Sequence, residues 1–427
     1  MMKRFILLLS IFAMLFAQAS FTFASTKIEI VTCPGSMVEY LSQLIEKYQA
    51  KHPDVKFTLT VMEQEQQRAT LPVIMSTPGA PPTGWLNYGS GDVPALVETG
   101  AVENLDRYYK KYGWWSFLPK HLNTHRINGS MYHFSLAFVT TPLIFYNKAI
   151  FAKVGIETPK TLEDLFTISA KLRKAGYQPL LMGDRDAWPG FHMYQVIASR
   201  TTPLEEYNKI LYMTRNEVKM GDYPGFAEAF QIMRDMETKG VWGDGVLSMD
   251  DMEARQVFLN RKGAMYESGT WIISELRKGL GDELGFFLFP QVHNNIPIVL
   301  TVSYPDEYIL SAYVDQRTKD IIADFYNYVL STEGQKIVAT TGAMPIRTDL
   351  TSKSFKGSKV DPIAIEIMEL FGSGKYDTTD EIVTFWGNEL YAELRSVVQK
   401  VIGGQVSPKE AVVQLDKVAA RVRGAKK

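Results

Sequence analysis

Apolar residues near the start of the chain follow two different spacings. Residues 28–31 are rich in β-branched side chains and predict a strand, apolar residues within 38–48 recur at helical spacing, and residues 55–61 alternate as a second strand. A strand, a helix and a strand in this order form a βαβ unit, which implies a parallel sheet. In open α/β sheets, ligands bind beyond the carboxyl ends of the strands. The turn at 33–36 follows the first strand, so Ser36 is a candidate ligand-binding residue.

The most regular pattern lies between residues 143 and 179. An apolar, aromatic run at 143–146 predicts a buried strand, and a short helix follows that stops at Gly155. Thr161 can cap a second helix, because Asp164 stands three residues later in the position of a capping box. Every local signal here agrees, which makes this stretch the best-defined part of the predicted fold.

The N-terminus has the features of a segment that directs export. Two basic residues precede an apolar run over 5–16 and small residues up to Ala24. This pattern is typical of a secretory signal peptide, which we predict to cover residues 1–24. A membrane anchor is the alternative, and cleavage after Ala19 is a second option. The lone Cys33 lacks the sequence context of a lipoprotein, so we expect an exported, soluble protein.

Size, charge and composition exclude several classes of function. Removal of 24 residues from 427 leaves 403, enough for two domains of roughly 200 residues each. A net charge of −1 argues against nucleic acid and anionic membranes as main partners. A single cysteine excludes an internal disulfide. The six histidines are scattered along the sequence, so neither a metal site nor a cofactor is expected.

Aromatic residues make up 12% of the chain and are concentrated at 108–117, where Lys110 and Lys111 stand between them. Such a cluster can be interpreted as a stacking platform for nucleic acid or as an iron-binding pair of tyrosines. Aromatic residues that pack a helix onto a core are the commoner explanation, and the neutral net charge favours it.

Two motifs resemble a known family. The first is the Tyr-Asn-Lys that begins at Tyr146, with the Gly-Ile, the Pro-x-Thr and the acidic-Leu helix that follow it. The second is Lys-Gly-Ala-Met at 262–265 followed by Gly269-Thr270-Trp271, although Arg261 stands where the family has glycine. With these motifs the chain resembles the family 1 extracellular solute-binding proteins of ABC importers, which are maltose-binding-protein-like.

The resemblance implies a fold, a location and partners. The expected fold class is α/β, the periplasmic-binding-protein type II fold, with two α/β lobes, a multi-strand hinge and a ligand cleft between the lobes. Residues 25–139 and 303–343 would form lobe 1, and residues 140–302 and 344–427 would form lobe 2. We expect a periplasmic monomer that binds a carbohydrate and delivers it to the membrane permease subunits of an ABC importer.

The resemblance also points to individual cleft residues. Trp85 matches the position of a ligand-stacking ring after the third strand, in a loop that also carries Asn87 and Tyr88. The chain is expected to cross to lobe 2 near Thr140, which makes Thr140 a cleft residue. Trp386 matches a position that often supplies the last stacking ring, and core packing is an equal alternative.

Two further groups of candidates come from the ends of predicted strands in lobe 2. Trp271 opens a helix at the carboxyl end of a strand, two residues after Gly269, where free backbone N–H groups also face the cleft. We interpret its ring as ligand-stacking, and core packing is the alternative. The loop at 183–191 carries Asp184, Asp186 and Trp188, which can offer carboxylates for sugar hydroxyls and a ring for a sugar face. An ordinary surface turn is the alternative, and the sequence does not rank the two acids.

Aromatic rings with a polar rim suit a sugar, but other ligands fit the same fold. Arg185 or Arg347 could pair with glycerol phosphate or an acidic sugar, whereas a polyamine would need acidic groups between the rings. An exported glycoside hydrolase is a further alternative and needs two placed carboxylates. The available acid pairs are Asp184/Asp186, Asp250/Asp251 and Asp282/Glu283. No catalytic motif of another kind is recognisable.

Overall fold

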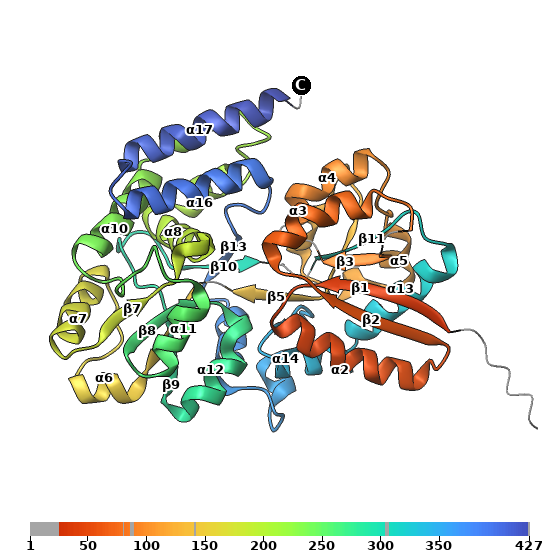
Figure 1. The fold of residues 1–427 in the computed structure, drawn as a ribbon, viewed down its shortest axis with the longest axis horizontal. Coiled ribbons are helices and arrows are strands. Elements are labelled where there is room, and N and C mark those ends of the chain that lie inside the picture. Colours follow the sequence, from red (N-terminus) through yellow and green to blue (C-terminus); the bar gives the residue numbers. More distant parts are fainter. Residues whose placement is uncertain (1–24, 80, 86–88, 141, 304–306, 426–427) are drawn as a thin grey trace, which may run out of the picture.

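The computed structural model describes residues 25–79, 81–85, 89–140, 142–303 and 307–425. The predicted signal peptide, Asn87 and Tyr88 lie outside the described residues, and so does the side chain of Trp85. Within the described residues, the strands form three sheets of five, four and four strands. Figure 1 shows two α/β lobes, one on each side of a small central sheet. This arrangement confirms the expected fold class.

Lobe 1 is built on a sheet with the strand order β2-β1-β3-β11-β4. Its strands are β1 (Thr26–Thr32), β2 (Val55–Val61), β3 (Thr83–Trp85), β4 (His133–Ser135) and β11 (Glu307–Leu310). Strand β1 is parallel to β2 and β3, which confirms the predicted βαβ unit, and β11 runs antiparallel to β3 and β4. The helices of this lobe are α2 (Ser36–Lys51), α3 (Gln64–Met75), α4 (Gly89–Glu98), α5 (Asp106–Tyr112), α13 (Gln316–Val329) and α14 (Thr332–Thr340), with 3₁₀ turns η1 (Trp114–Ser116) and η2 (Lys120–His125).

Lobe 2 is built on a sheet with the strand order β7-β8-β6-β9. Its strands are β6 (Leu143–Asn147), β7 (Gln178–Leu181), β8 (Gly263–Ser268) and β9 (Leu284–Leu288). Its main helices are α6 (Lys148–Val154), α7 (Leu162–Lys174), α8 (Trp188–Thr201), α9 (Leu204–Ile210), α10 (Pro224–Thr238), α11 (Asp251–Leu259), α12 (Ile273–Leu280), α15 (Pro362–Gly372), α16 (Asn388–Ile402) and α17 (Pro408–Ala425). Helices α16 and α17 pack against each other and against α10, so the C-terminal part of the chain completes this lobe (Figure 1).

The central sheet connects the lobes and has the strand order β12-β5-β10-β13. Its strands are β5 (Ala137–Thr140), β10 (Val299–Ser303), β12 (Met344–Pro345) and β13 (Asp377–Asp380). The sequence predicted chain crossings near the ends of β5 and β10. It did not predict β13, because this polar segment, Asp-Thr-Thr-Asp, lacks the apolar alternation of a strand.

Local sequence signals fix several elements as predicted. The side chain of Thr161 accepts the backbone N–H of Asp164, and the Asp164 carboxylate accepts that of Thr161, so the capping box of α7 is confirmed. Asn128 and Gly129 both adopt positive φ angles, 50° and 84°, in the turn between bridged Ile127 and Ser130. That is the backbone that an Asn-Gly hairpin turn requires.

The aromatic residues between 108 and 117 pack the core of lobe 1. Tyr108, Tyr109 and Trp114 are buried, and Trp114 lies edge-on to Tyr109 at 4.9 Å and to Phe134 at 5.6 Å. Helix packing is therefore what this cluster does in the fold. Within the described part of the chain, no helix combines the length and the apolar character that a membrane crossing requires.

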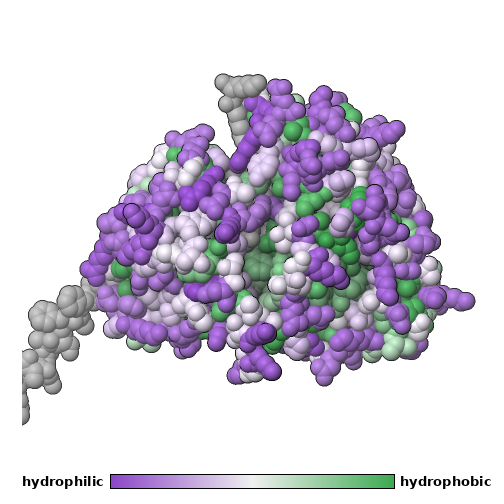
Figure 2. All heavy atoms as spheres, turned by 180° about the vertical axis from the view of Figure 1, so that it is seen from behind, coloured by the Kyte–Doolittle hydropathy of each residue, from purple (hydrophilic) through white to green (hydrophobic). Residues whose placement is uncertain are grey.

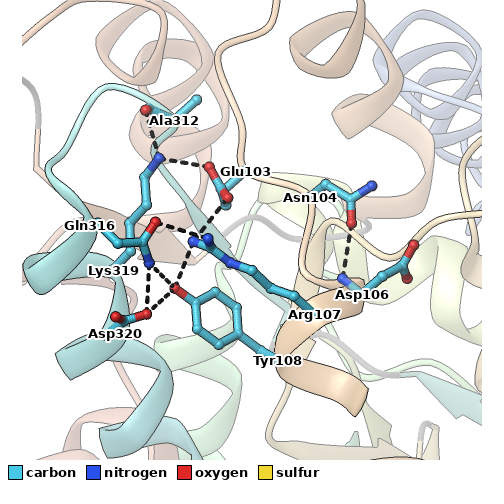
Figure 3. A network of polar contacts seen from close by, with 9 residues as sticks. All are labelled: Glu103, Asn104, Asp106, Arg107, Tyr108, Ala312, Gln316, Lys319 and Asp320. Carbon is cyan, nitrogen blue, oxygen red and sulfur yellow. Dashed lines mark hydrogen bonds and ion pairs between the residues drawn. The ribbon is translucent and has the colours of Figure 1, made fainter. Parts of the chain in front are cut away.

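A polar network ties α5 to α13 on the flank of lobe 1 (Figure 3). Lys319 donates from Nζ to Glu103 at 2.7 Å and to the carbonyl of Ala312 at 2.9 Å. The hydroxyl of Tyr108 donates to Asp320 at 2.8 Å. The side chains of Lys319 and Glu103 are only 12% and 19% exposed, so water screens this ion pair weakly.

We expect Lys319→Met to lower the free energy of unfolding by roughly 1–3 kcal/mol, because it removes a charged hydrogen bond in a poorly hydrated place. Lys47→Met is the matched control, since Lys47 and its partner Glu333 are about half exposed, at 52% and 50%. The control should cost less than about 1 kcal/mol. Urea denaturation of both variants measures the difference, and equal losses would contradict the interpretation.

Candidate functional site

Two half-buried tryptophans and a histidine meet on lobe 2. Trp188 begins α8, and Trp271 lies in η5 (Thr270–Ile272), directly after the carboxyl end of β8. Their ring centroids are 6.0 Å apart at 64°, and His192 lies 5.3 Å from Trp188 and 5.8 Å from Trp271. We call these three residues the tryptophan cluster. The structure thus brings together two of the four rings that the sequence suggested as ligand-stacking, Trp188 and Trp271.

The tryptophan cluster lies beside the central sheet. A side chain on Gly342, which precedes β12, would come within 3.0 Å of the carbonyl oxygen of Thr270. The space-filling view in Figure 2 shows apolar atoms in a recess near the middle of the molecule, surrounded by hydrophilic surface. An ion pair between Lys278 of α12 and Glu39 of α2, at 3.9 Å, connects facing helices of the two lobes.

Gly269 makes room for the ring of Trp271. A Cβ atom at position 269 would lie only 1.9 Å from Cζ3 of the Trp271 indole. The backbone of Gly269 is extended, with φ of −114°, so space and not conformation requires glycine here. Gly269 therefore positions the ring, which gives a physical reason for the Gly-x-Trp motif.

One face of α8 runs from the tryptophan cluster to the central sheet. Trp188, His192 and Gln195 are spaced four and three residues apart and share this face. Gln195 donates to Glu381 at 3.1 Å and accepts the backbone N–H of Ile382, also at 3.1 Å. His192 Nε2 lies 3.5 Å from the Glu381 carboxylate.

His192 and Glu381 are members of the candidate site that the sequence did not reveal. Burial lowers the pKa of His192 to about 3, so its imidazole is neutral and can donate one hydrogen bond and accept another. The helical spacing from Trp188 could have indicated His192. Glu381 follows a strand that the sequence did not predict, and no local signal marks it.

Asp184 holds the first turn of α8 through a hydrogen bond to its backbone. It is fully buried, and its Oδ1 accepts the backbone N–H of Gly190 at 2.7 Å, in the first turn of that helix. A Cβ atom at Gly190 would lie 2.5 Å from Asp184 Oδ2, so glycine permits the approach. Burial raises the pKa of Asp184 to about 7. Asp184 thus positions the helix that carries Trp188, which differs from the predicted direct contact with ligand. Asp186 is exposed at the end of η3 (Asp184–Asp186).

The other predicted ligand-binding residues in the described part of the chain lie outside the tryptophan cluster. Trp386 is 1% exposed, and its indole N–H donates to the carbonyl of Ile210 at 2.9 Å, so it packs in the core of lobe 2. Of the two interpretations left open for this ring, the structure shows core packing. The hydroxyl of Thr140 donates to the carbonyl of Thr301 at 2.8 Å, between two strands of the central sheet. Ser36 is buried at the start of α2.

Charged side chains gather where lobe 1 meets the central sheet. His125 Nδ1 lies 2.8 Å from Glu307, its Nε2 lies 3.4 Å from Asp380, and His121 Nε2 lies 2.7 Å from Asp380. His133 Nδ1 lies 3.5 Å from Glu307. We call these five residues the hinge network. The expectation that the histidines are scattered is therefore wrong, because the fold brings three of the six together.

The carboxylates of the hinge network determine the charge of His125. Burial disfavours the imidazolium, but hydrogen bonds to Asp380 and Glu307 outweigh burial and raise the pKa of His125 to about 10. Burial acts in the opposite sense on Asp380, and its contacts with His121 and His125 nevertheless lower its pKa to about 2. The positive charge of His125 thus partly offsets the negative charge of the buried acids Asp380 and Glu307, which lie on either side of it.

We expect Asp184 to lower the stability of the protein as the pH rises from about 4 to about 7. His192 acts in the opposite direction over much of this range, because burial lowers its pKa to about 3. The folded-state pKa of Asp184, about 7, lies above its unfolded value, so the fold favours the protonated form. The contribution is complete below the unfolded pKa and is lost as the pH rises through the folded pKa, at up to about 1.4 kcal/mol per pH unit.

The variant Asp184→Asn should lose this decrease, so that its stability relative to the wild type rises with pH from about 4 to about 7. The amide oxygen can still accept the Gly190 N–H. Asp186→Asn is the control, since that carboxylate is exposed. Urea denaturation at a series of pH values measures both. Parallel profiles for the wild type and Asp184→Asn would show that this carboxyl group does not titrate as described.

Several curated proteins are similar to this chain. An uncharacterised ABC transporter extracellular-binding protein of Pyrococcus horikoshii is 22% identical over 323 residues, which cover 74% of this chain and 70% of that protein. A second P. horikoshii protein of the same description is 24% identical over 188 residues, which cover 42% of this chain and 41% of that protein. The sn-glycerol-3-phosphate-binding periplasmic protein of Agrobacterium fabrum is 21% identical over 355 residues, with coverages of 78% and 77%.

Solved structures share the fold over nearly the whole chain. A chitin oligosaccharide binding protein matches with a TM-score of 0.81 and 18% identity, over 94% of this chain and 99% of that chain. Maltose-bound T. maritima MalE3 matches with a TM-score of 0.74 and 16% identity, over 93% and 99%. At these identities the likeness concerns the fold.

The family model of the bacterial extracellular solute-binding proteins matches residues 34–336, which include both motifs noted in the sequence, the tryptophan cluster and most of the hinge network. This match extends over more than half of the chain. The chain therefore belongs to the family of bacterial extracellular solute-binding proteins.

Proposed function

We propose that this protein is exported, captures a neutral sugar or oligosaccharide between its two lobes, and delivers it to the permease of an ABC importer. The observation that carries the proposal is the tryptophan cluster, in which two half-buried indoles meet beside an uncharged imidazole. The export step rests on the predicted signal peptide over residues 1–24.

A sugar ring presents apolar C–H patches surrounded by hydroxyls, and the site offers a counterpart for each. Each indole face of about 60 Å² contributes about 1.5 kcal/mol at roughly 25 cal/mol/Å². His192 can exchange hydrogen bonds with hydroxyls, and Glu381 lies 3.5 Å from it as a further acceptor. Rings with a small number of placed polar groups are the usual composition of a small-molecule site.

An anionic solute is the second candidate, because one group of relatives is named for sn-glycerol-3-phosphate. The two arginines that the sequence suggested for an anion already have carboxylate partners. Arg347 donates to both carboxylate oxygens of Asp349, at 2.9 and 2.6 Å, and Arg185 donates to Asp250 and to Glu253. This pairing supports a neutral ligand over a phosphate.

At least one member of each acid pair that a glycoside hydrolase could use has a structural role, as described above for Asp184. Asp250 caps α11 and pairs with Arg185, and Asp251 accepts the hydroxyl of Tyr266 at 2.5 Å. Glu283 pairs with Arg261 at 2.8 Å. Carboxylates held in this way support the fold and favour binding over hydrolysis as the function.

The two-lobe fold supplies the proposed mechanism. The tryptophan cluster belongs to lobe 2, and Trp85, at the end of β3, belongs to lobe 1. A solute that contacts both lobes stabilises the closed arrangement, because it has more contacts there than in the open one. The permease would then recognise the closed form.

A thermal-shift screen of the mature protein should show a higher Tm with one or more oligosaccharides. A ligand at about 100 times its Kd adds about 2.7 kcal/mol of stability, which amounts to a few degrees. Trp271→Ala should abolish the shift, while Trp115→Ala should retain it, since Trp115 is a partly buried indole in lobe 1. A Tm shift with glycerol phosphate or polyamines alone would overturn the proposal that the ligand is a sugar. Hydrolysis of the added sugar would indicate an enzyme.

Gly269→Ala gives a subtler test of the same site. The added methyl group must displace the Trp271 ring, because the two would lie 1.9 Å apart. We expect at least about tenfold weaker sugar binding, which corresponds to about 1.4 kcal/mol and is close to the loss of one ring face. The Trp emission spectrum reports the ring movement directly. Gly372→Ala, at the end of α15 with open space around it and no positive φ, is the control for binding. Unchanged sugar affinity in Gly269→Ala would show that the Trp271 ring does not contact the ligand.

A further inference from the structure

In the hinge network, two histidines of one short helical segment face a single carboxylate, an arrangement that ion pairing alone does not require. His121 and His125 both come from η2 of lobe 1, whereas Asp380 is the last residue of β13 in the central sheet. The two histidines stand four residues apart on one short helical segment, and their rings are 6.3 Å apart at 73°. Both direct Nε2 to the same carboxylate, one to each oxygen.

The separations of these atoms suit a metal ion. The ligand atoms of His121, His125 and Asp380 all lie within 4.8 Å of one another. His121 Nε2 and His125 Nε2 lie 2.7 and 3.4 Å from the oxygens of Asp380. Two ligand atoms bound to Zn²⁺ at about 2.0–2.1 Å with a tetrahedral angle lie roughly 3.4 Å apart. Shifts of under about 1 Å would therefore bring the three groups into coordination distance.

A second carboxylate orients His125 in the way that metal sites use. Its Nδ1 lies 2.8 Å from Glu307, which leaves Nε2 directed at Asp380. Metal-ligating histidines commonly donate their other ring N–H to a carboxylate, which fixes the ring and raises its basicity. Glu307 is itself fixed in β11 and also lies 3.5 Å from His133.

One of the three side chains is exposed to solvent and the other two are buried. The side chain of His121 is 40% exposed, whereas those of His125 and Asp380 are 2% and 1% exposed. An ion could therefore enter at His121 and reach two ligands that the fold holds in place, His125 and Asp380. It would replace the proton on Nε2 of His125, which is released to solvent, because a histidine binds metal through an unprotonated ring nitrogen. Three protein ligands leave a fourth position for water, as in open zinc sites.

We propose that His121, His125 and Asp380 bind a divalent transition metal ion of the Zn²⁺ class, with Glu307 as the carboxylate that orients His125. Two imidazoles and one carboxylate are ligands that suit zinc and its neighbours better than calcium or magnesium. The ion joins η2 of lobe 1 to the end of β13, and so it braces the junction between the lobes. The proposal does not depend on the identity of the solute.

Titration calorimetry with Zn²⁺ tests the site, on mature protein prepared without a histidine tag and stripped of metal with a chelator. We expect one equivalent to bind and to raise the Tm. His121→Ala should abolish this binding, and Glu307→Gln should weaken it by about 10–100-fold. Co²⁺ should give a visible absorption band with the wild type that His121→Ala lacks.

His293→Ala is the matched control, because His293 is also a partly exposed histidine beside a carboxylate, 3.0 Å from Glu228, but lies outside the hinge network. It should bind Zn²⁺ like the wild type. Since His121 is partly exposed, its replacement should leave the protein folded, which circular dichroism checks. Absence of saturable Zn²⁺ and Co²⁺ binding in the wild type, or unchanged binding in His121→Ala, would overturn the proposal.

Discussion

The central sheet is the constraint on which the rest of the structure depends. All movement between the lobes must pass through its strands, which are held together by backbone hydrogen bonds and by the bond from Thr140 to Thr301. Hinges of two-lobed proteins are a few element ends that absorb the change in backbone angles, and we expect the strand ends of this sheet to be that hinge. The sheet also places the candidate site, because the tryptophan cluster and the hinge network both lie at its border.

The precision of the tryptophan cluster comes from backbone packing beneath it. Asp184 holds the first turn of α8, and Gly269 gives the Trp271 ring its place against the chain. Both contacts exist because glycine occupies the opposing position, at 190 and 269. A buried carboxyl group with a raised pKa costs stability at neutral pH, and the fold tolerates this cost where it orients a binding helix.

Sequence reasoning succeeded where the determining interactions are local. The capping box of α7 depends on residues three apart, and the Gly-x-Trp motif places Trp271 within a single turn. It could not decide between the two interpretations of Trp386, because a core ring and a cleft ring have the same local pattern. The hinge network was out of reach for another reason: Asp380 lies 255 residues from His125 in sequence. Only the topology of the central sheet brings such residues together.

Two consecutive residues at the end of β13 face different partners, and this links the two sites. Asp380 contacts His121 and His125 of lobe 1, while Glu381 contacts Gln195 and lies near His192 on α8 of lobe 2. Adjacent residues on an extended backbone point to opposite sides, so one strand end can serve both lobes. A change in lobe angle that moves this strand end must alter both sets of contacts. The hinge network and the polar groups beside the tryptophan cluster therefore cannot move independently, because Asp380 and Glu381 are consecutive residues.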